Sequence, residues 1–424
     1  MNFDRMRALL LDQAIRGELV PQLAEEGAVE IGAIAPEAFK LPKTWKWLTL
    51  KSLVIPTKQI IPEESFTYLD VSSIKKFQID EIKRLDPSNA PSRARKVVQP
   101  GMVLFATVRP YLKNICVSPE LPGQVIASTA FATMTCSKDL NNRYLFYFLR
   151  SDFFMDLVKS KQRGISYPAI SEKDFYALPV PVPPLDEQIR IVAKLDEAIT
   201  EIDRAEKAYQ ELQTLSGVLR GQILQEAIQG KLVPQLDSEE EVEQIGDVPK
   251  EVPFDIPEKW KWYSAKDVYQ LLSGRDLTKS EILEIQPNEQ SFPYITGASQ
   301  IHDSSIVINR WTKECVVKSQ IGDLLLTCKG TVGKTAINTV GDLHIARQIM
   351  ALRPNKSVMS VAFLRLFIDT LSKRLAREAK SMIPGIDRKA LMSKPVPVPP
   401  LQEQKRIVEM VEELFKQVEA LSSK

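Results

Sequence analysis

Three charged side chains in the first half of the sequence could form a nuclease site. Asp70, Glu81 and Lys83 have the D…ExK order of metal-dependent nucleases. The pattern is short, the second half has no counterpart, and such triplets arise often in a chain with 26% charged residues. We therefore expect ordinary surface roles for these side chains and keep a D…ExK nuclease as an alternative function.

The other chemistry-bearing patterns are weaker still. The run CKGTVGKT at 328 to 335 ends like a phosphate-binding loop, but Cys328 takes the place of the first glycine, which favours a glycine-containing β-turn. Only two histidines, and four cysteines without a CxxC pair, argue against His-based catalysis and structural zinc. GxGxxG, GxSxG and Asn/Asp-Pro-Pro-aromatic runs are absent. The sequence therefore predicts no catalytic site, no metal and no cofactor.

The sequence contains two copies of one frame. Three anchors recur: QAIRGELVPQL at 13 to 23 and EAIQGKLVPQL at 226 to 236, LPKTWKW at 41 to 47 and IPEKWKW at 256 to 262, and LPVPVPPLDEQIRIV at 178 to 192 and KPVPVPPLQEQKRIV at 394 to 408. Such long repeats indicate a duplicated structural unit. Between the anchors the copies diverge, so the frames should match while the interiors differ.

The order of the anchors differs between the copies. The GELVPQL helix opens the chain in one copy and follows the PVPVPPL helix in the other, so one copy is circularly permuted. For both copies to fold alike, the helix at 401 to 424 must lie beside, or end to end with, the helix at 2 to 16. We expect a pseudo-twofold molecule whose termini meet.

Periodicity predicts a long helix at 185 to 229. This segment contains no proline, and its apolar residues recur at three- and four-residue steps, as in a helix packed on a partner. The predicted seam is Val192, Leu195, Ile199, Ile202, Ala205, Tyr209, Leu212, Leu215 and Leu219. The preceding PVPVPP run must be extended, because proline lacks a backbone donor and disfavours helix in its predecessor.

The fold class follows from the segments between the anchors. Short Val/Ile/Thr/Phe runs bounded by Gly and Pro predict strands, and each set ends in a helical stretch. We expect an α+β fold with two β-rich domains separated by a long antiparallel α-helical coiled coil. The predicted parts are an N-terminal helix completing the distal helical region at 1–40, a first domain at 41–180, a central helical spacer at 181–236, a solvated acidic linker at 237–253, a second domain at 254–395 and a C-terminal helical region at 396–424.

Charge is unevenly distributed along the chain. Residues 41–180 hold 20 Lys/Arg against 12 Asp/Glu (+8), residues 254–395 hold 21 against 14 (+7), and the rest hold 15 against 28 (−13), which together give the net charge of +2. Two cationic domains on an acidic frame suggest a polyanion bound at two places. A basic surface that only keeps a domain soluble would give the same count, so charge alone leaves DNA binding open.

The sequence also gives an expectation about location. No apolar run approaches the ~18 residues that span a bilayer, and the N-terminus alternates charge with leucine like an amphipathic helix, unlike a signal peptide. We expect a cytoplasmic protein without membrane contacts.

The permuted frame closely resembles the specificity subunit of type I restriction-modification systems. The motif PLxEQxRIV begins a helix twice in one chain, each time after a variable domain of about 140 residues, and the resemblance spans essentially the whole chain. In that family, target recognition domains each read one half of a split DNA sequence. The conserved helices form an antiparallel spacer that docks the methyltransferase subunits, one per half.

The resemblance implies a chain without catalysis of its own. Its partners would be double-stranded DNA, two methyltransferase subunits and the restriction (translocase) subunits, and S-adenosylmethionine, ATP and Mg would belong to those subunits. A helical spacer of fixed length would set the gap between two unlike half-sites. The bases that are read are not disclosed by the sequence.

Base reading should fall to loop residues that make bidentate hydrogen bonds or pack on sugars and bases. The candidates are Arg93, Arg95, Arg109, Lys113, Asn114, Gln162, Arg163 and Tyr167 in the first domain, and Arg275, Lys279, Lys329, Lys334, Arg347, Gln348 and Arg388 in the second. A solvated or salt-bridged role remains the alternative for each. On the frame, Arg190 and Arg406 could meet the methyltransferase. We expect Leu185, Ile189, Val192, Leu401 and Ile407 in the helical seam, and Trp45, Trp47, Trp260 and Trp262 as core anchors.

Two other functions stay open. One is a helical scaffold whose basic domains bind protein, which protection of a split DNA site would exclude. The other is the D…ExK nuclease, in which Glu81→Ala should abolish metal-dependent cutting.

Overall fold

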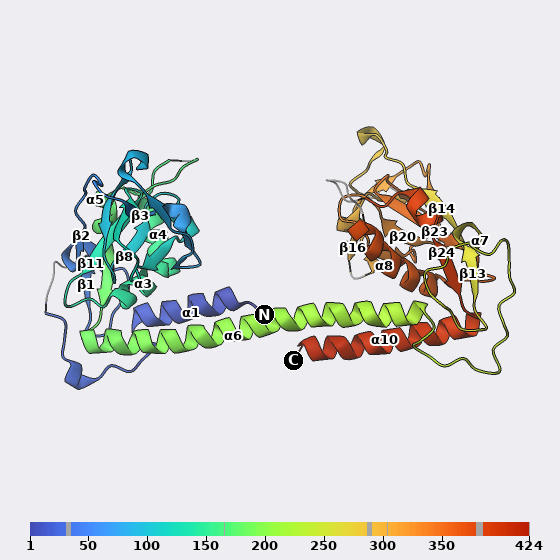
Figure 1. Cartoon of the computed structure of the whole chain (residues 1–424), viewed down its shortest axis with the longest axis horizontal. Coiled ribbons are helices and arrows are strands. Elements are labelled where there is room, and N and C mark those ends of the chain that lie inside the picture. The colour runs from blue at the N-terminus through green and yellow to red at the C-terminus, as the bar shows by residue number, and fades with distance from the viewer. Residues whose placement is uncertain (31–34, 165, 286–290, 303, 379–384, 424) are drawn as a thin grey trace. The chain divides into compact units, whose positions relative to one another are not determined.

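The computed structural model divides the chain into two compact units, Met1–Tyr209 and Gln210–Lys424 (Figure 1). The structure describes residues 1–30, 35–164, 166–285, 291–302, 304–378 and 385–423. Helix α6, Leu185–Ile228, is continuous over 44 residues and gives its first part to one unit and its last part to the other. The predicted α+β class, with a long helix between two β-rich domains in the chain, is confirmed. The meeting of the termini stays a prediction.

The first unit combines two four-stranded sheets with short helices. Its strands are β1 (Lys46–Thr49), β2 (Val54–Pro56), β3 (Phe66–Leu69), β4 (Ile74–Lys75), β5 (Gln78–Ile79), β6 (Lys83–Leu85), β7 (Ala94–Val98), β8 (Val103–Ala106), β9 (Ile115–Val117), β10 (Gln124–Ser128), β11 (Phe131–Cys136) and β12 (Pro179–Val182). Its helices besides α6 are α1 (Phe3–Arg16), α2 (Leu50–Leu53), α3 (Asn142–Arg150), α4 (Asp152–Lys161) and α5 (Glu172–Tyr176), with 3₁₀ turns η1 (Ala24–Glu26), η2 (Val71–Ser73), η3 (Pro87–Asn89) and η4 (Pro110–Leu112).

The second unit repeats this plan. Its strands are β13 (Lys261–Ser264), β14 (Tyr269–Ser273), β15 (Phe292–Ile295), β16 (Ile301–His302), β17 (Ser305–Ile306), β18 (Trp311–Thr312), β19 (Lys318–Ser319), β20 (Leu324–Thr327), β21 (Thr335–Ile337), β22 (Leu343–Ile345), β23 (Ile349–Pro354) and β24 (Pro395–Val398). Its helices are α7 (Ala265–Val268), α8 (Val361–Glu378), α9 (Arg388–Met392) and α10 (Leu401–Ser423), with 3₁₀ turns η5 (Lys279–Glu281) and η6 (Ala298–Gln300).

The sheets of the two units have the same topology. In the first unit the orders are β6-β3-β10-β7 and β2-β11-β8-β9, and in the second they are β18-β15-β22-β19 and β14-β23-β20-β21. Each unit has one parallel pair in the same place, β3 with β10 and β15 with β22. The predicted duplication of the frame therefore extends into the interiors, although their sequences have diverged.

The repeated sequence anchors pair with one another as strands. Trp47 in β1 lies opposite Pro181 in β12, and Trp262 in β13 lies opposite Pro397 in β24. The PVPV runs are extended, as predicted, and because proline occupies alternate positions the intervening valines keep the backbone donors that a ladder needs. The indoles are buried, with Trp45 5% and Trp260 2% exposed, which confirms their role as core anchors.

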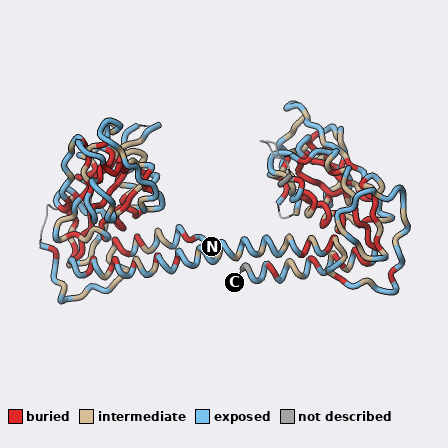
Figure 2. The backbone as a smooth tube through the Cα atoms, viewed as in Figure 1, coloured by how far each residue is buried: buried red, intermediate tan, exposed pale blue. Residues whose placement is uncertain are grey.

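A short helix runs antiparallel to each end of α6. In the first unit Phe3 of α1 packs on Tyr209, and Gln22, which follows α1, reaches Glu187 near the start of α6. In the second unit the guanidinium of Arg220 lies 5.1 Å from the ring of Phe415 in α10. Buried residues of each helix pair belong to the main core of their unit. Figure 2 shows red, buried segments along these helices. Each unit therefore contains its own piece of the antiparallel spacer.

The predicted seam is only partly correct. Val192, Leu195, Ile199, Ile202 and Ile407 are buried, as expected. Leu215 and Leu219 are 65% and 42% exposed, and Leu185, Ile189 and Leu401 are 41% to 49% exposed, so their assignment to the seam was wrong. Ala205 is exposed as well. Leu219 is exposed although its neighbour Arg220 lies against Phe415 of α10, so Leu219 lies on a side of α6 that α10 does not cover.

A helix predicted as one segment is broken by a serine. Ser151 separates α3 from α4, and its hydroxyl donates to the Phe148 carbonyl at 2.7 Å and accepts from the Phe154 amide at 3.2 Å. Serine suits a helix N-cap because its side chain replaces the missing backbone partner. Within the described residues, the structure has no helix that is both long and apolar enough to cross a membrane.

Candidate nucleic-acid interface

The turn between β10 and β11 collects several candidates of the first domain. The Thr129 amide donates to the Arg93 carbonyl at 2.8 Å, and both the amide and the hydroxyl of Thr107 donate to the Ala130 carbonyl, at 2.8 and 2.9 Å. Thr107 and Arg109 in turn hold the segment at 166–170, because Ile170 donates to Thr107 and Arg109 donates to Pro168. Arg93, Arg109, Arg163 and Tyr167 are thus brought to one end of the domain.

Arg109 and Tyr167 form a stacked pair within this cluster. The Arg109 guanidinium lies 4.6 Å from the centre of the Tyr167 ring, which is 68% exposed. Arg109 has a left-handed backbone, with φ of 49°, a conformation that costs energy for a residue other than glycine. Gly164, with φ of +89°, makes the turn before Tyr167, where a Cβ would lie 2.9 Å from the Tyr167 carbonyl. These two backbone turns place the Arg109 and Tyr167 side chains next to each other.

The remaining candidates of the first domain are less free. The Lys113 ammonium donates to Asp152 at 2.9 Å, and the Asn114 amide donates to the Val71 carbonyl at 3.1 Å. The half-buried Arg95 donates to the Ala94 carbonyl at 2.7 Å, and the Gln162 backbone ends α4. Lys113 and Asn114 therefore have structural partners, and a DNA contact for any of the four stays a prediction.

The second domain gathers four of its seven candidates at the equivalent turn. Arg347 and Gln348 lie in the turn between β22 and β23, where the Cys328 amide donates to the Gln348 carbonyl at 2.8 Å and the Arg275 amide donates to the Ile345 carbonyl at 2.9 Å. The close packing needs glycine, because a Cβ on Gly274 would lie 2.1 Å from the Ala346 carbonyl. Lys329 is beside this turn and bridges to Gly385.

The charges at this second turn are partly paired. Arg347 is exposed and forms an ion pair with Asp276 at 2.8 Å. The other three residues at this turn, Arg275, Lys329 and Gln348, are exposed as well. Three other candidates lie elsewhere in the domain. Arg388 donates to the Leu271 carbonyl at 3.0 Å, Lys279 is exposed on η5, and the Lys334 ammonium donates to the carbonyls of Ala298 and Ile301.

His344 lies directly beneath the Arg275 loop. Its Nε2 donates to the Arg275 carbonyl at 2.8 Å, and its Nδ1 accepts from the Val317 amide at 3.1 Å, so the neutral ring satisfies both neighbours. Burial lowers the pKa of His344 below its ordinary value, despite the nearby carboxylates of Glu281 and Asp276.

This histidine should make the second unit sensitive to acid. Because the unfolded chain binds the proton more readily than the folded chain, stability should be full above about pH 6.5 and fall as the pH drops toward the lower pKa of the folded state. Urea midpoints of the second unit, measured from about pH 7.5 to 5, should fall in the natural protein and fall less in His344→Gln, which cannot titrate. An equal decline in both proteins would contradict the role of His344.

The repeated motifs also build a buried polar joint in each unit. The first joint consists of Gln22, Glu26, Trp45, Glu187 and Arg190. Glu187 accepts from the Trp45 indole at 2.9 Å and from the Gln22 amide at 3.0 Å, and Arg190 binds both carboxylate oxygens of Glu26. Burial raises the pKa of Glu187. All three sequence anchors thus meet at one place.

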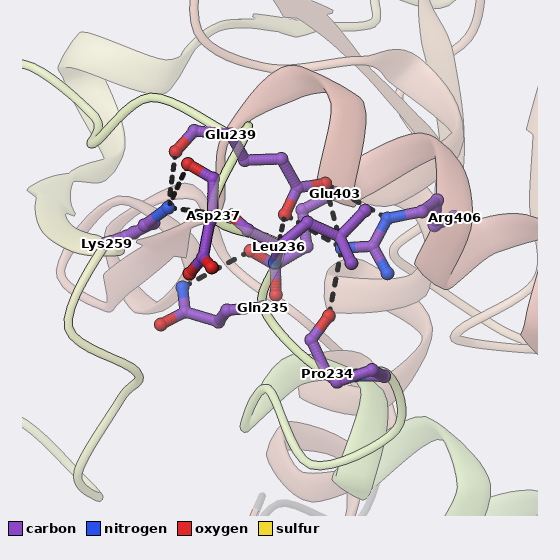
Figure 3. Close-up of polar contacts among 8 residues, drawn as sticks. All are labelled: Pro234, Gln235, Leu236, Asp237, Glu239, Lys259, Glu403 and Arg406. Carbon is purple, nitrogen blue, oxygen red and sulfur yellow. Dashed lines mark hydrogen bonds and ion pairs between the residues drawn. The ribbon is translucent and has the colours of Figure 1, made fainter.

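The second joint has a similar plan, as Figure 3 shows for Gln235, Glu239, Glu403 and Arg406. Trp260 occupies the position that matches Trp45 and is buried, but its indole nitrogen does not make the hydrogen bond that Trp45 makes. Arg406 binds Glu239, whose side chain is only 1% exposed, and Gln235 donates to Glu403 at 3.4 Å. Lys259 donates to the carbonyls of Leu236, Asp237 and Glu239 and so pins the start of the acidic linker. The expectation of a solvated linker is therefore wrong for Glu239.

Arg190 and Arg406, predicted as partner contacts, are thus engaged inside their own chain. Their side chains remain 29% and 27% exposed, and a partner contact stays a prediction. The sequence had marked the EQxR motif only as a helix start. Its identical recurrence in both copies was the signal that these polar side chains have a shared structural task.

The alternative nuclease triplet has ordinary local roles. The Asp70 carboxylate caps η2 by accepting from the Val71 amide at 2.9 Å, and Glu81 and Lys83 are exposed residues that lie 3.7 Å apart. Among the described residues, no group of three or more His, Cys, Asp or Glu side chains could hold a metal ion. The CKGTVGKT run forms the loop between β20 and β21, with positive φ at Gly330 and Gly333, and the predicted β-turn within it stays a prediction.

The fold and the surface define a two-domain recognition protein. Each domain presents basic side chains beside the same turn of the same topology, together with Tyr167 in the first domain and Gln348 in the second. A family model described as the type I restriction modification DNA specificity domain matches residues 118–214 and 257–424. The chain belongs to this family, the DNA specificity subunits of type I restriction-modification systems, which recognise DNA and are not themselves enzymes.

Individual relatives agree with this assignment. The specificity subunit of the Escherichia coli type I restriction enzyme EcoAI is 22% identical, covering 97% of this chain and 88% of the relative. The HsdS subunit from Thermoanaerobacter tengcongensis is 30% identical, with a TM-score of 0.58 over 91% of this chain and 93% of that one. A chain from a structure that describes complex assembly and conformational transition of the type I restriction-modification system is also 30% identical. Its TM-score is 0.76, over 91% of this chain and 93% of that one.

Proposed function

We propose that this specificity subunit reads an asymmetric, bipartite DNA site, with one half-site for each domain. The proposal rests on one observation: the equivalent turns of the two domains carry different side chains, although the domains share one topology. The first domain offers the Arg109–Tyr167 stack, whereas the second offers Arg347 paired with Asp276 beside Gln348. Arginine and glutamine make bidentate contacts to base edges, so unlike sets should read unlike bases.

The duplicated frame supports an equally duplicated set of partners. Two methyltransferase subunits, one for each joint and helix pair, fit a frame that occurs twice, and the restriction subunits would complete the complex. The S-adenosylmethionine, ATP and Mg that such reactions use would then be held by those subunits, in the cytoplasm. This chain contributes the choice of DNA site.

Selection from random duplexes tests the proposal. The isolated chain should bind DNA weakly and with strong salt dependence, and the complex with the cognate methyltransferase should enrich one split sequence with unlike halves. Sequencing of modified bases in the host genome should show the same split sequence. Enrichment of a continuous site, or of no sequence, would overturn the proposal.

A further inference from the structure

A cationic cavity of about 360 Å³ opens in the second unit. It lies where the β16–β17 hairpin, the β20–β21 turn, α8, the end of α6 and α10 come together. Its basic lining residues are Arg220, Lys334, Arg365 and Lys373, and Leu224 and Phe415 form part of its apolar wall. We call this cavity, defined by these residues, the basal pocket.

The one acidic side chain described in the basal pocket already has partners within the protein. Asp369 is the one carboxylate among the described residues that line it. It accepts from the Thr335 hydroxyl at 2.6 Å and lies 3.6 Å from Arg365. The Lys334 ammonium donates to the Ala298 and Ile301 carbonyls, which orient it without neutralising its charge. The described lining therefore keeps an excess of positive charge.

The first unit fills the equivalent corner. The Asn141 amide donates to Gln188 as the Ser360 amide donates to Gln404, which aligns the start of α3 with the start of α8. Arg150 and Asp369 then occupy matching positions along these helices. In the first unit the Arg150 guanidinium lies 3.8 Å from the ring centre of Phe77, at the tip of the β4–β5 hairpin.

The hairpin tip explains the difference between the units. The tips of both hairpins have positive φ, at Phe77 in the first unit and Ser304 in the second. Phe77 packs edge-on against Phe146 as well as on Arg150, whereas Ser304 is small and only its hydroxyl meets Arg365. The second unit thus has a cavity where its repeat has an aromatic plug, although the surrounding frame is shared.

We propose that the basal pocket binds a phosphate group, and that in the assembled complex this is a backbone phosphodiester of the bound duplex. Arginine and lysine hydrogen bonds to phosphate oxygens are charge-assisted and carry no sequence information. An apolar wall beside the cations suits the deoxyribose that flanks each phosphate. The inference rests on the proposed function, because it assumes that the second domain engages duplex DNA.

The test compares Lys373→Ala with Lys266→Ala in the complex with the methyltransferase. Lys373 is exposed on α8 at the basal pocket, whereas Lys266 is exposed on α7, which Figure 1 shows on the far side of the domain from β16. Loss of one phosphate contact should reduce the steepness of log K against log salt by about 0.9 and weaken binding about fivefold at 0.15 M salt, equally for all sequences. Lys266→Ala should change neither value.

A second measurement locates the phosphate. In a series of duplexes, one phosphate at a time is replaced by a neutral methylphosphonate. At one position this replacement should weaken binding by the natural complex but should not further weaken binding by the Lys373→Ala complex, which has already lost the contact. An unchanged salt slope in Lys373→Ala would overturn the proposal. The proposal would also be overturned if Lys373→Ala weakened the binding of inorganic phosphate or ATP and left DNA binding unchanged. If the natural complex selected no DNA sequence, the proposed function itself would fail, which is a distinct result.

Discussion

Replacing Arg406 by alanine should lower the free energy of unfolding of the second unit by about 3–5 kcal/mol. Arg406 meets Glu239 through contacts of 2.8 to 3.0 Å, and the Glu239 side chain is 1% exposed. Without the guanidinium, a buried carboxylate loses its counter-charge and cannot regain water. Urea titration, with hydrogen exchange of α10 and β24 as the local readout, would measure the change.

The double variant Arg406→Met with Glu239→Leu separates charge burial from packing. Apolar residues of similar size remove both charges together, so most of the lost stability should return. Lys405→Ala serves as the control, because its side chain is 79% exposed and the change should stay within about 0.5 kcal/mol. A double variant as unstable as Arg406→Ala would show that the ion pair is not what Arg406 supplies.

The frame could be predicted from the sequence because its signals are local and occur twice. Apolar periodicity placed α6 to within a residue at its end, and prolines at alternate positions required an extended PVPV run. The matched tryptophans were predicted as anchors because a large indole at the same place in two diverged copies indicates a core position. Burial confirms this for Trp45, Trp47, Trp260 and Trp262.

The grouping of the site could not be predicted, because it depends on contacts between residues far apart in the chain. Arg93 and Arg109 come together only because the Thr129–Ala130 turn holds the backbone on both sides. Lys113 looked equivalent to Arg109 in the sequence, yet it is drawn to Asp152. Composition gives no sign of such competition, since any exposed carboxylate can engage a lysine once the fold brings them near.

The joints were missed for a related reason. Glu187 stands in a helix start, where an acidic residue is explained by the helix dipole alone. Its bond to Trp45 links residues that the sequence separates by the whole first domain. A polar side chain repeated in both copies at a helix start therefore indicates a tertiary partner as much as a local cap.

Replacing Arg109 by lysine should relax sequence preference in the half-site read by the first domain and leave the other half-site unchanged. Lysine keeps the charge but loses the planar fork that makes bidentate contacts and stacks on Tyr167. The expected loss of discrimination is about 1–3 kcal/mol, or roughly fivefold to 150-fold, with an almost unchanged salt slope. Selection and sequencing of duplexes bound by the methyltransferase complex gives both half-sites in one experiment.

Variants of Tyr167 and Lys113 test whether the effect depends on the stacked arginine. Tyr167→Phe keeps the stack and should keep the specificity, whereas Tyr167→Ala frees the guanidinium and should resemble Arg109→Lys. Lys113→Ala should leave base preference intact, because its ammonium is engaged by Asp152. Uniform weakening on all sequences by Arg109→Lys would mean that Arg109 contacts phosphate. Relaxation confined to the other half-site would contradict the assignment of Arg109 to base reading by its own domain, since a side chain can discriminate only the base edges within its reach.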